Sequence, residues 1–309
     1  MQVIVHGGAG SPPEEPADRQ AVLDEAAACG REQSTPLEAV CAAVRVLEVD
    51  PGFNAGVGGA VQSDGVVRTD AGVMTGDGTT GAAAAMPGVA HAVDVARAVA
   101  AETPHVCLAG ERAVAFADAV GVETGVDLLT DRTRERWAGE DPPADLADQV
   151  EWVRERFGSG VAGDVEGAGG HPAHDVGEDR PAGPPQDHDT VGAVAVDGDA
   201  VAAATSTGGR WAALAGRVGD VPQVGSGFFA SPAGGASATG AGEDIAREGL
   251  ARRAVALLEQ GADAGTAARL AIEEFDDAAE GSAGVVVAGT DGSTGEAYCS
   301  PAMQTARRT

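Results

Sequence analysis

Residues 188–209 of the chain are HDTVGAVAVDGDAVAAATSTGG. The apolar run 190–196 predicts a strand, the DGD sequence at 197–199 predicts a hairpin turn, and the run 200–205 predicts the returning strand. This stretch therefore predicts a pair of antiparallel strands in the core of the protein.

The segment that precedes the hairpin has a different composition. Of the 31 residues in 158–188, 12 are Gly or Pro, and the large apolar residues are Val161, Val165 and Val176. Such a segment cannot bury enough apolar surface to offset the entropy lost on ordering it. We therefore predict a flexible linker that ends where the core strand begins.

Outside these two stretches, strands alternate with helices. Thr35-Pro36-Leu37-Glu38 predicts a helix start, because it combines a capping box with Pro in the first turn. Strands are expected at 2–6, where Gly7-Gly8 would end the strand, and at 65–74, 284–288 and 296–299. Helices are expected at 18–29, 36–49, 91–101, 110–119, 145–156, 243–259 and 264–276, with a glycine-rich section at 216–242. The pattern predicts one α/β layered domain over 1–309, with stacked, mainly antiparallel sheets covered by helices.

The chain of 309 residues is strongly acidic. It carries 48 acidic residues against 20 basic ones, all of them Arg, for a net charge of −28. This charge excludes nucleic-acid binding through phosphate neutralisation and argues against docking on anionic membranes. The absence of Lys resembles the composition of halophilic proteins, although an ordinary acidic bacterial protein is the alternative.

The N-terminal segment, the apolar runs and the cysteines indicate the cellular compartment of the protein. The start, MQVIVHGGAG, lacks the charged and long apolar regions of a signal peptide, and no apolar run is long enough to span a membrane. The four cysteines are scattered, as is usual for reduced thiols. We therefore expect a cytoplasmic protein.

Thr190, at the junction of linker and strand, has two interpretations. Thr favours strands, so its position alone has a structural explanation. Alternatively, the backbone is cut before Thr190, and the new terminus carries a nucleophilic hydroxyl and a basic amine on one residue. A free α-amine has a pKa of about 7.7–8.0, so part of it is neutral near pH 7 and can accept the hydroxyl proton.

Three other segments favour the catalytic interpretation. TSTGG at 205–209 ends the strand that pairs with the Thr190 strand, so its hydroxyls are expected near Thr190. Arg217 and Asp220 form either a surface ion pair or a site for the carboxylate and ammonium of an amino acid. The ATGAG sequence at 238–242 is either a glycine-rich helix entry or an oxyanion hole formed by backbone N–H groups and the Thr239 hydroxyl.

Taken in order, six motifs resemble one known family. They are HGGAG at 6–10, FNAGVGGAV at 53–61, HDTVGAVAVD at 188–197, TSTGG at 205–209, GRVGD at 216–220 and TGAGED at 239–244. Together they resemble the plant-type L-asparaginase/isoaspartyl peptidase family of N-terminal-nucleophile hydrolases. The resemblance covers about 1–90 and 187–309.

The resemblance implies an αββα sandwich that cleaves itself between Asp189 and Thr190, giving fragments 1–189 and 190–309 that pair into an (αβ)₂ assembly. Thr190 would be the nucleophile, Thr207 a supporting hydroxyl, and Thr239 and Gly240 the oxyanion hole. Arg217 and Asp220 would bind the α-carboxylate and α-amine of the substrate, and Asn54 belongs to the FNAG motif near the nucleophile.

The resemblance also implies a structural sodium ion, with no other cofactor. Its loop would be 47–57, through backbone carbonyls of the following residues: Leu47, Glu48, Asp50, Phe53, Ala55 and Val57. Asp189 departs from the Gly that many asparaginases carry before the Thr, and it matches the related glycosylasparaginases.

The function that the resemblance implies is hydrolysis of L-asparagine and β-aspartyl peptides. An isoaspartyl bond leaves the α-carboxylate and α-amine of the aspartyl residue free, and an Arg217/Asp220 pair could bind both. A glycosylasparaginase-like hydrolase is the near alternative. An uncleaved, non-enzymatic amino-acid-binding protein is the alternative of a different class.

Overall fold

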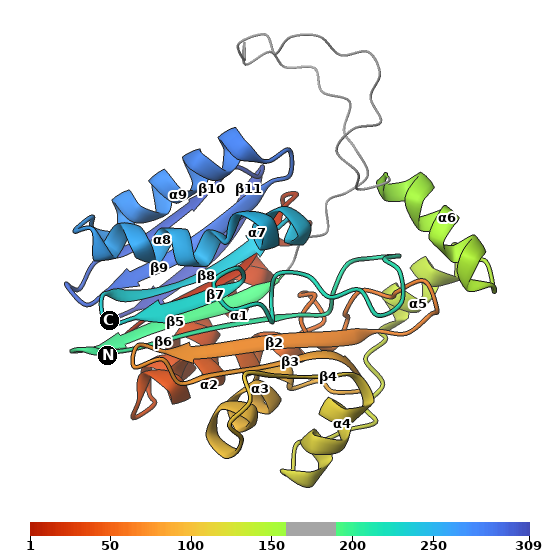
Figure 1. The fold of residues 1–309 in the computed structure, drawn as a ribbon, viewed down its shortest axis with the longest axis horizontal. Helices are drawn as coiled ribbons and strands as arrows, with labels where there is room; N and C mark the ends of the chain where they lie inside the picture. The colour runs from red at the N-terminus through yellow and green to blue at the C-terminus, as the bar shows by residue number, and fades with distance from the viewer. Residues whose placement is uncertain (159–189) are drawn as a thin grey trace, which may run out of the picture.

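The computed structural model describes residues 1–158 and 190–309, which fold around two stacked β-sheets (Figure 1). The larger sheet has seven strands in the order β11-β1-β5-β6-β2-β3-β4, and all its pairings are antiparallel except β3 with β4. Its strands are β1 (Gln2–Gly10), β2 (Arg68–Thr75), β3 (Thr80–Pro87), β4 (Cys107–Ala109), β5 (Val191–Asp197), β6 (Ala200–Thr207) and β11 (Ala302–Arg308). The smaller, antiparallel sheet contains β7 (Phe228–Ser231), β8 (Gly234–Gly240), β9 (Ala283–Gly289) and β10 (Thr294–Tyr298).

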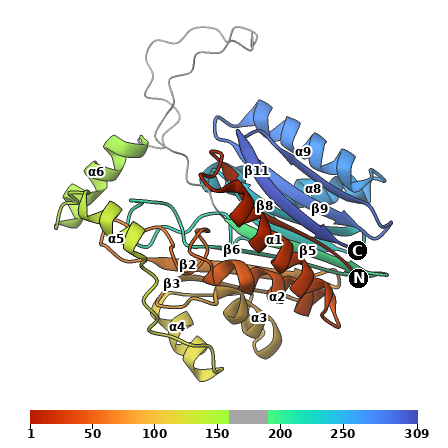
Figure 2. The same cartoon turned by 180° about the vertical axis from the view of Figure 1, so that it is seen from behind.

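Helices cover the outer face of each sheet, as Figure 2 shows from behind. The larger sheet is covered by α1 (Pro16–Arg31), α2 (Pro36–Val49), α3 (Ala92–Glu102) and α4 (Gly110–Ala119). The smaller sheet is covered by α8 (Leu250–Glu259) and α9 (Ala264–Ala278), and α7 (Gly242–Glu248) directly follows β8. Two further helices, α5 (Asp131–Ala138) and α6 (Leu146–Phe157), lie beyond one end of the sheets. These four layers confirm the predicted αββα sandwich.

The hairpin β5–β6 lies at the centre because both of its faces are apolar. On β5, Ala193 and Ala195 pack into the core beneath α1–α3, whereas Val194 and Val196 point into the core between the sheets. Successive side chains of a strand alternate between its faces, so a strand buried on both sides has to be apolar throughout.

The helix start at Thr35 was predicted correctly. Its side chain accepts a hydrogen bond from the Glu38 backbone N–H at 3.3 Å and donates to the Glu38 carboxylate at 3.0 Å. The Thr35 cap satisfies a donor that the first turn of α2 would otherwise leave unpaired, but the Glu38 carboxylate binds the Thr35 hydroxyl and not the Thr35 N–H that a capping box would use.

Three sequence predictions about elements were wrong. β1 does not stop at Gly7-Gly8 but continues to Gly10, with a register shift between His6 and Ala9. The glycine-rich section 216–242 contains the two buried strands β7 and β8, which were not predicted. The helix predicted over 243–259 is two helices, because Gly249 adopts a left-handed conformation with φ of 65°.

Two predictions, a linker at 158–188 and no membrane-spanning helix, depend on which residues the structure describes. Apart from Gly158, the predicted linker 158–188 lies outside the described residues, as does Asp189. Within the described ranges, no helix is both long and apolar enough to cross a membrane.

Candidate active site

The first element of the site is a pair of threonine hydroxyls on neighbouring strands. Thr190 immediately precedes β5, and Thr207 is the last residue of β6. Because β5 and β6 are antiparallel and Val191 pairs with Ser206, these two residues come to the same end of the sheet. Thr190 is only 7% exposed, and its Oγ1 donates to Thr207 Oγ1 at 3.2 Å. The structure thus brings together the two hydroxyls that the sequence singled out.

The turn that follows Thr207 is fixed by Asn54. The Asn54 Nδ2 donates to the Gly209 carbonyl at 2.8 Å, and its Oδ1 accepts from the Ala60 N–H at 2.8 Å. The Gly209 N–H in turn donates to Thr207 Oγ1 at 3.1 Å. Both ends of the Asn54 amide therefore bind backbone groups, and this geometry supports a positioning role for Asn54 rather than contact with a reacting atom.

Arg217 and Asp220 line one pocket together with the threonine pair. The pocket is lined by Thr190, Thr207, Gly209, Arg210, Arg217, Asp220, Gly240 and Gly242. A Cβ atom on Gly242 would lie 2.7 Å from Asp220 Oδ1 and 2.8 Å from Arg217 Nη2. The absence of a side chain at 242 therefore leaves room for the Asp220 carboxylate and the Arg217 guanidinium beside this backbone.

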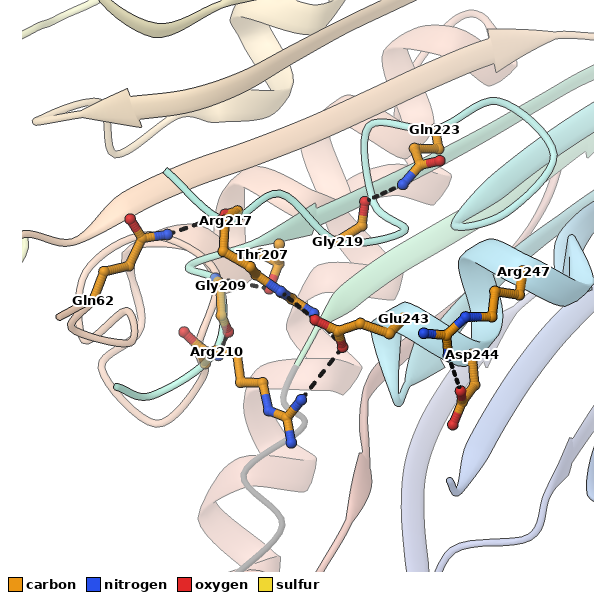
Figure 3. Close-up of polar contacts among 11 residues, drawn as sticks. Gln62, Thr207, Gly209, Arg210, Arg217, Gly219, Gln223, Glu243, Asp244 and Arg247 are labelled. Atoms are coloured by element: carbon orange, nitrogen blue, oxygen red, sulfur yellow. Dashed lines mark hydrogen bonds and ion pairs between the residues drawn. The ribbon is translucent and has the colours of Figure 1, made fainter. Parts of the chain in front are cut away.

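A carboxylate that the sequence analysis missed also binds Arg217. Glu243 Oε1 accepts from Arg217 Nε, and Glu243 Oε2 accepts from Arg217 Nη2, both at 2.8 Å (Figure 3). A guanidinium has five N–H donors, so the edge formed by Nη1 and the second Nη2 proton remains for another carboxylate. Glu243 thus holds the guanidinium in one plane. Its place in TGAGED, directly after Gly242, is the signal that could have suggested it.

The two carboxylates next to Arg217 have pKa values shifted in opposite directions. Burial pushes the pKa of Glu243 upward, but the hydrogen bonds and charges of Arg217 and Arg210 outweigh this effect and lower that pKa to about 2. Burial raises the pKa of Asp220 to about 7, although the Arg217 charge opposes the shift. Asp220 Oδ2 has no hydrogen-bond partner within residues 1–158 and 190–309. A buried carboxylate with an unpaired oxygen is suited to accept a hydrogen bond from a cation that enters the pocket.

Thr239 and Gly240 come to the site from the other sheet. Both lie at the end of β8, and Gly240 reaches the pocket itself. Thr239 is fully buried, and its Oγ1 accepts from the Ala9 N–H at 3.3 Å. The Ala241 N–H donates to the Ser282 carbonyl at 2.8 Å, so the backbone after Gly240 is tied to β9. The second sheet therefore supplies a fixed glycine backbone opposite Thr190.

Gln62 supports the turn that carries Arg217. This side chain is 1% exposed, and its Oε1 accepts from the Gly216 N–H at 2.8 Å and from Arg68 Nη1 at 2.9 Å. Its Nε2 donates to the Arg217 carbonyl at 3.1 Å. One buried amide thus binds the backbone on both sides of the residue 216–217 peptide. No role for Gln62 could be predicted from the sequence, because nothing in FNAGVGGAVQ shows which distant turn this side chain contacts.

A second buried polar chain connects the HGGAG segment to the two sheets. His6 Nε2 lies 2.8 Å from Ser237 Oγ, which lies 2.6 Å from Thr205 Oγ1, and Thr205 donates to the Gly227 carbonyl. Thr205 gives its proton to that carbonyl, so its oxygen is left to accept from Ser237, and the His6 ring forms the other end of this chain. Burial lowers the pKa of His6 to about 3, so the ring is neutral near pH 7. His6 therefore joins β1 to the underside of the hairpin.

The loop expected to bind sodium closes on itself next to Glu48. The Val57 N–H donates to the Glu48 carbonyl at 2.9 Å, and the Phe53 N–H donates to the Asp50 carbonyl at 3.1 Å. The Ala55 carbonyl accepts from Ser206 Oγ. Backbone carbonyls are hard oxygen donors of the kind that alkali cations take, and each has a second lone pair, so the chemistry of these atoms fits a sodium ion that shares them.

The carboxylate of Glu48 has a role that the sequence analysis did not foresee. Its Oε1 accepts from Ser206 Oγ at 2.7 Å and from the Val93 N–H at 2.9 Å, and its Oε2 lies 3.4 Å from His91 Nδ1. Burial raises the pKa of Glu48, and its neighbour His91 has its pKa raised by the same contact. Glu48 thus anchors α2 to the residue that precedes Thr207.

Comparison with known proteins identifies the class to which this fold and pocket belong. The family model described as asparaginase matches residues 1–309, which is the whole chain. The chain therefore belongs to the asparaginase family.

Individual relatives agree with this assignment. The chain is 36% identical over 279 residues to a plant-type L-asparaginase of Pyrococcus abyssi, a match that covers 88% of this chain and 84% of the relative. It is 39% identical over 280 residues to a plant-type L-asparaginase of Pyrobaculum calidifontis, covering 88% and 84%. It is 35% identical over 313 residues to an isoaspartyl peptidase/L-asparaginase of Danio rerio, covering 97% and 90%.

Proposed function

We propose that the protein is an amidohydrolase that cleaves the side-chain amide of L-asparagine and the β-aspartyl bond of isoaspartyl peptides. The observation that carries the proposal is the pocket in which the Thr190–Thr207 hydroxyl pair meets Arg217, Asp220 and Gly240. The names of the relatives point to the same two substrates.

The nucleophile in this proposal is made by self-cleavage. Thr190 Oγ1 attacks the carbonyl carbon of Asp189, the acyl group moves from nitrogen to oxygen, and water hydrolyses the ester. The products are a carboxylate on Asp189 and a free α-amine on Thr190. That amine has a pKa of about 7.7–8.0 in model peptides, so it can accept the hydroxyl proton near neutral pH.

The substrate is held by its amino-acid head group. Its α-carboxylate binds the edge of Arg217 that Glu243 leaves available, and its α-ammonium binds the unpaired oxygen of Asp220. A β-aspartyl peptide presents the same head group as L-asparagine, so one pair of residues can serve both substrates. Binding through these fixed groups places the β-carbonyl carbon against Thr190 Oγ1.

Hydrolysis then takes two steps. Thr190 Oγ1 bonds to the β-carbonyl carbon, and Gly240 with Thr239 stabilises the negative charge that develops on oxygen. Collapse of this tetrahedral species breaks the C–N bond, and the leaving nitrogen takes the proton from the Thr190 amine. Water next attacks the acyl-enzyme, which releases aspartate and restores the Thr190 hydroxyl. Thr207 donates or accepts a hydrogen bond at the nucleophile throughout.

The test uses Thr190→Ala with Thr190→Ser as its control. On a denaturing gel, the wild type and Thr190→Ser should show two fragments, with residue 190 as the new N-terminus of one. Thr190→Ala should stay a single chain near 30.5 kDa and release no aspartate from L-asparagine. Cleavage of Thr190→Ala at the same bond would show that Thr190 is not the attacking group.

Three further properties belong to the proposal. We place a sodium ion on the 47–57 carbonyls, an (αβ)₂ assembly in solution, and the protein in the cytoplasm of a salt-accumulating cell. The carbonyl oxygens of the loop and the net charge of −28 support the first and the last of these. Light scattering after size exclusion tests the assembly.

A further inference from the structure

One charged residue of the pocket has no part in the reaction described above. Of the eight lining residues, three are charged, and Arg217 and Asp220 hold the head group of the substrate. The third is Arg210, which follows Thr207 by three residues and lines the pocket from the turn after β6. The head group of L-asparagine gives Arg210 nothing to bind.

Arg210 is held loosely by its neighbours. Its Nη1 donates a long hydrogen bond of 3.4 Å to Glu243 Oε2, whereas Arg217 holds both oxygens of that carboxylate at 2.8 Å. Figure 3 shows the Glu243 carboxylate between the two guanidiniums. The single negative charge of Glu243 is therefore mostly committed to Arg217, and within residues 1–158 and 190–309 most N–H donors of Arg210 have no hydrogen-bond partner.

The backbone that carries Arg210 is nevertheless rigid. The neighbouring Trp211 is buried, and its indole Nε1 donates to Glu140 Oε1 at 2.9 Å. The Arg210 guanidinium also lies 4.1 Å from the centre of the Phe157 ring, which supports one of its faces. A cation stacked on an aromatic ring keeps its in-plane donors free to bind an anion.

The environment of Arg210 favours an anionic ligand. Burial and the charge of Arg217 together lower the pKa of Arg210, although Glu243 opposes the shift. Its side chain is 35% exposed, so a ligand in the pocket can reach it. Two neighbouring guanidiniums are notable in a chain with only 20 basic residues against 48 acidic ones. A carboxylate that enters the pocket would neutralise the positive charge of Arg210.

We propose that Arg210 binds the carboxylate of the leaving amino acid in β-aspartyl dipeptides. This inference rests on the proposed function, and it assigns the part of the pocket that accepts the leaving group. When the β-aspartyl bond breaks, the leaving group is an α-amino acid whose carboxylate is separated from the scissile nitrogen by one carbon. A dipeptide thus brings two carboxylates, one for Arg217 and one for Arg210, whereas L-asparagine brings only the first.

The experiment compares three substrates that differ only beyond the scissile nitrogen: β-aspartyl-leucine, β-aspartyl-leucine amide and L-asparagine. The enzymes are the wild type, Arg210→Gln, Arg210→Lys and, as a matched control, Arg253→Gln, which removes a surface arginine that is paired with Glu274. The quantity measured is the ratio of kcat/KM for the dipeptide acid to kcat/KM for its amide. Comparing this ratio between enzymes cancels the intrinsic reactivity of the two leaving groups.

Arg210→Gln should lower this ratio by about tenfold, because a charge-assisted hydrogen bond in a partly exposed pocket is lost. Its kcat/KM on L-asparagine and on the amide should fall by a smaller factor than its kcat/KM on the dipeptide acid. Arg210→Lys should lower this ratio by a smaller factor than Arg210→Gln does, and Arg253→Gln should leave it at the wild-type value.

Three outcomes would overturn the proposal, and they separate it from the proposed function. An unchanged ratio in Arg210→Gln would show that Arg210 does not bind the leaving carboxylate, while hydrolysis of the substrates would leave the proposed function standing. An equal loss on all three substrates would show that Arg210 acts only by supporting Glu243 and Arg217. If the wild type hydrolyses none of the three, the proposed function fails and this inference fails with it.

Discussion

Replacing Asp220 by Asn should stabilise the protein at neutral pH while impairing substrate binding. Asp220 is 4% exposed, burial raises its pKa to about 7, and its Oδ2 has no partner in the part of the chain that the structure describes. In the unfolded chain this carboxyl has a pKa of about 3.9. Between these two values the native state binds the proton and the unfolded state does not. The contribution of Asp220 to the free energy of unfolding is therefore fully present below about pH 4 and is lost as the pH rises to 7.

The size of the effect follows from the difference in pKa. About three pKa units, at about 1.36 kcal/mol each, correspond to a penalty of about 4 kcal/mol above pH 7. For a chain of this length the unfolding entropy is about 0.65 kcal/mol per kelvin, so the penalty corresponds to about 6 °C in Tm. Asn has the shape of Asp without its charge, so Asp220→Asn removes this pH-dependent cost. The expected gain is near zero at pH 4 and largest above pH 7.

The assay is a series of thermal melts from about pH 4 to pH 8 on Thr190→Ala and on Thr190→Ala/Asp220→Asn. The shared Thr190→Ala change keeps both proteins uncleaved, so processing does not differ between them. Burial also raises the pKa of Asp70 to about 7, but Asp70 is present in both proteins and largely cancels. A Tm difference that stays constant over this range, or that shrinks as the pH rises, would refute the argument that Asp220 is held at a cost.

Three other predictions concern binding, scaffold and salt. Arg217→Ala should raise the KM for L-asparagine by about 30-fold or more, since it removes a charge-assisted pair at a guanidinium that is only 16% exposed; an unchanged kcat/KM would remove Arg217 from the substrate site. Gln62→Leu should lower the Tm and raise the same KM several-fold, because it leaves the Gly216 N–H and the Arg217 carbonyl without their partner; steady-state kinetics that match the wild type would contradict this positioning role. The Tm should rise between about 0.1 M and 2 M in both NaCl and KCl, because salt screens the self-repulsion of a chain with a net charge of −28; a rise that needs only millimolar Na⁺ would instead identify the cation of the 47–57 loop as its source.

The sequence predicted the central hairpin well because its signal is local. Residues 190–207 combine apolar runs with a DGD turn, and β5 and β6 follow that pattern closely. β8 was missed because GGASATG has low strand propensity, and β7 was missed because FFAS, although it favours a strand, is only four residues long. A Cβ on Gly235 would lie 2.9 Å from a Val194 methyl of the facing sheet, so these small residues serve the close approach of two sheets. Such a requirement appears only when both sheets are in place.

In the active site, too, local features could be predicted from the sequence, whereas tertiary contacts could not. Thr190 and Thr207 could be placed together from the hairpin alone, since an antiparallel pair brings the start of one strand to the end of the next. Glu243 could not be paired with Arg217, from which it is separated by 26 residues, two strands and a change of sheet. Local patterns identify groups capable of chemistry, and the tertiary fold determines which charges neutralise one another.

Strand order explains why cleavage before Thr190 would not separate the fragments. The larger sheet interleaves them: β1, β2, β3 and β4 come from residues 1–189, whereas β5, β6 and β11 come from residues 190–309. Three antiparallel pairings, β11–β1, β1–β5 and β6–β2, therefore join the two fragments. The first ladder residue of β5 is Val191, so a cut before Thr190 breaks none of these hydrogen bonds.

The site itself depends on both fragments. Thr190, Arg217 and Asp220 would lie on one fragment, while the amides of Asn54 and Gln62 that hold their loops would lie on the other. Separating the fragments would therefore remove the supports of the 208–217 turn as well as three rows of strand hydrogen bonds. Cleavage can thus expose the Thr190 amine without loosening the pocket in which that amine has to act.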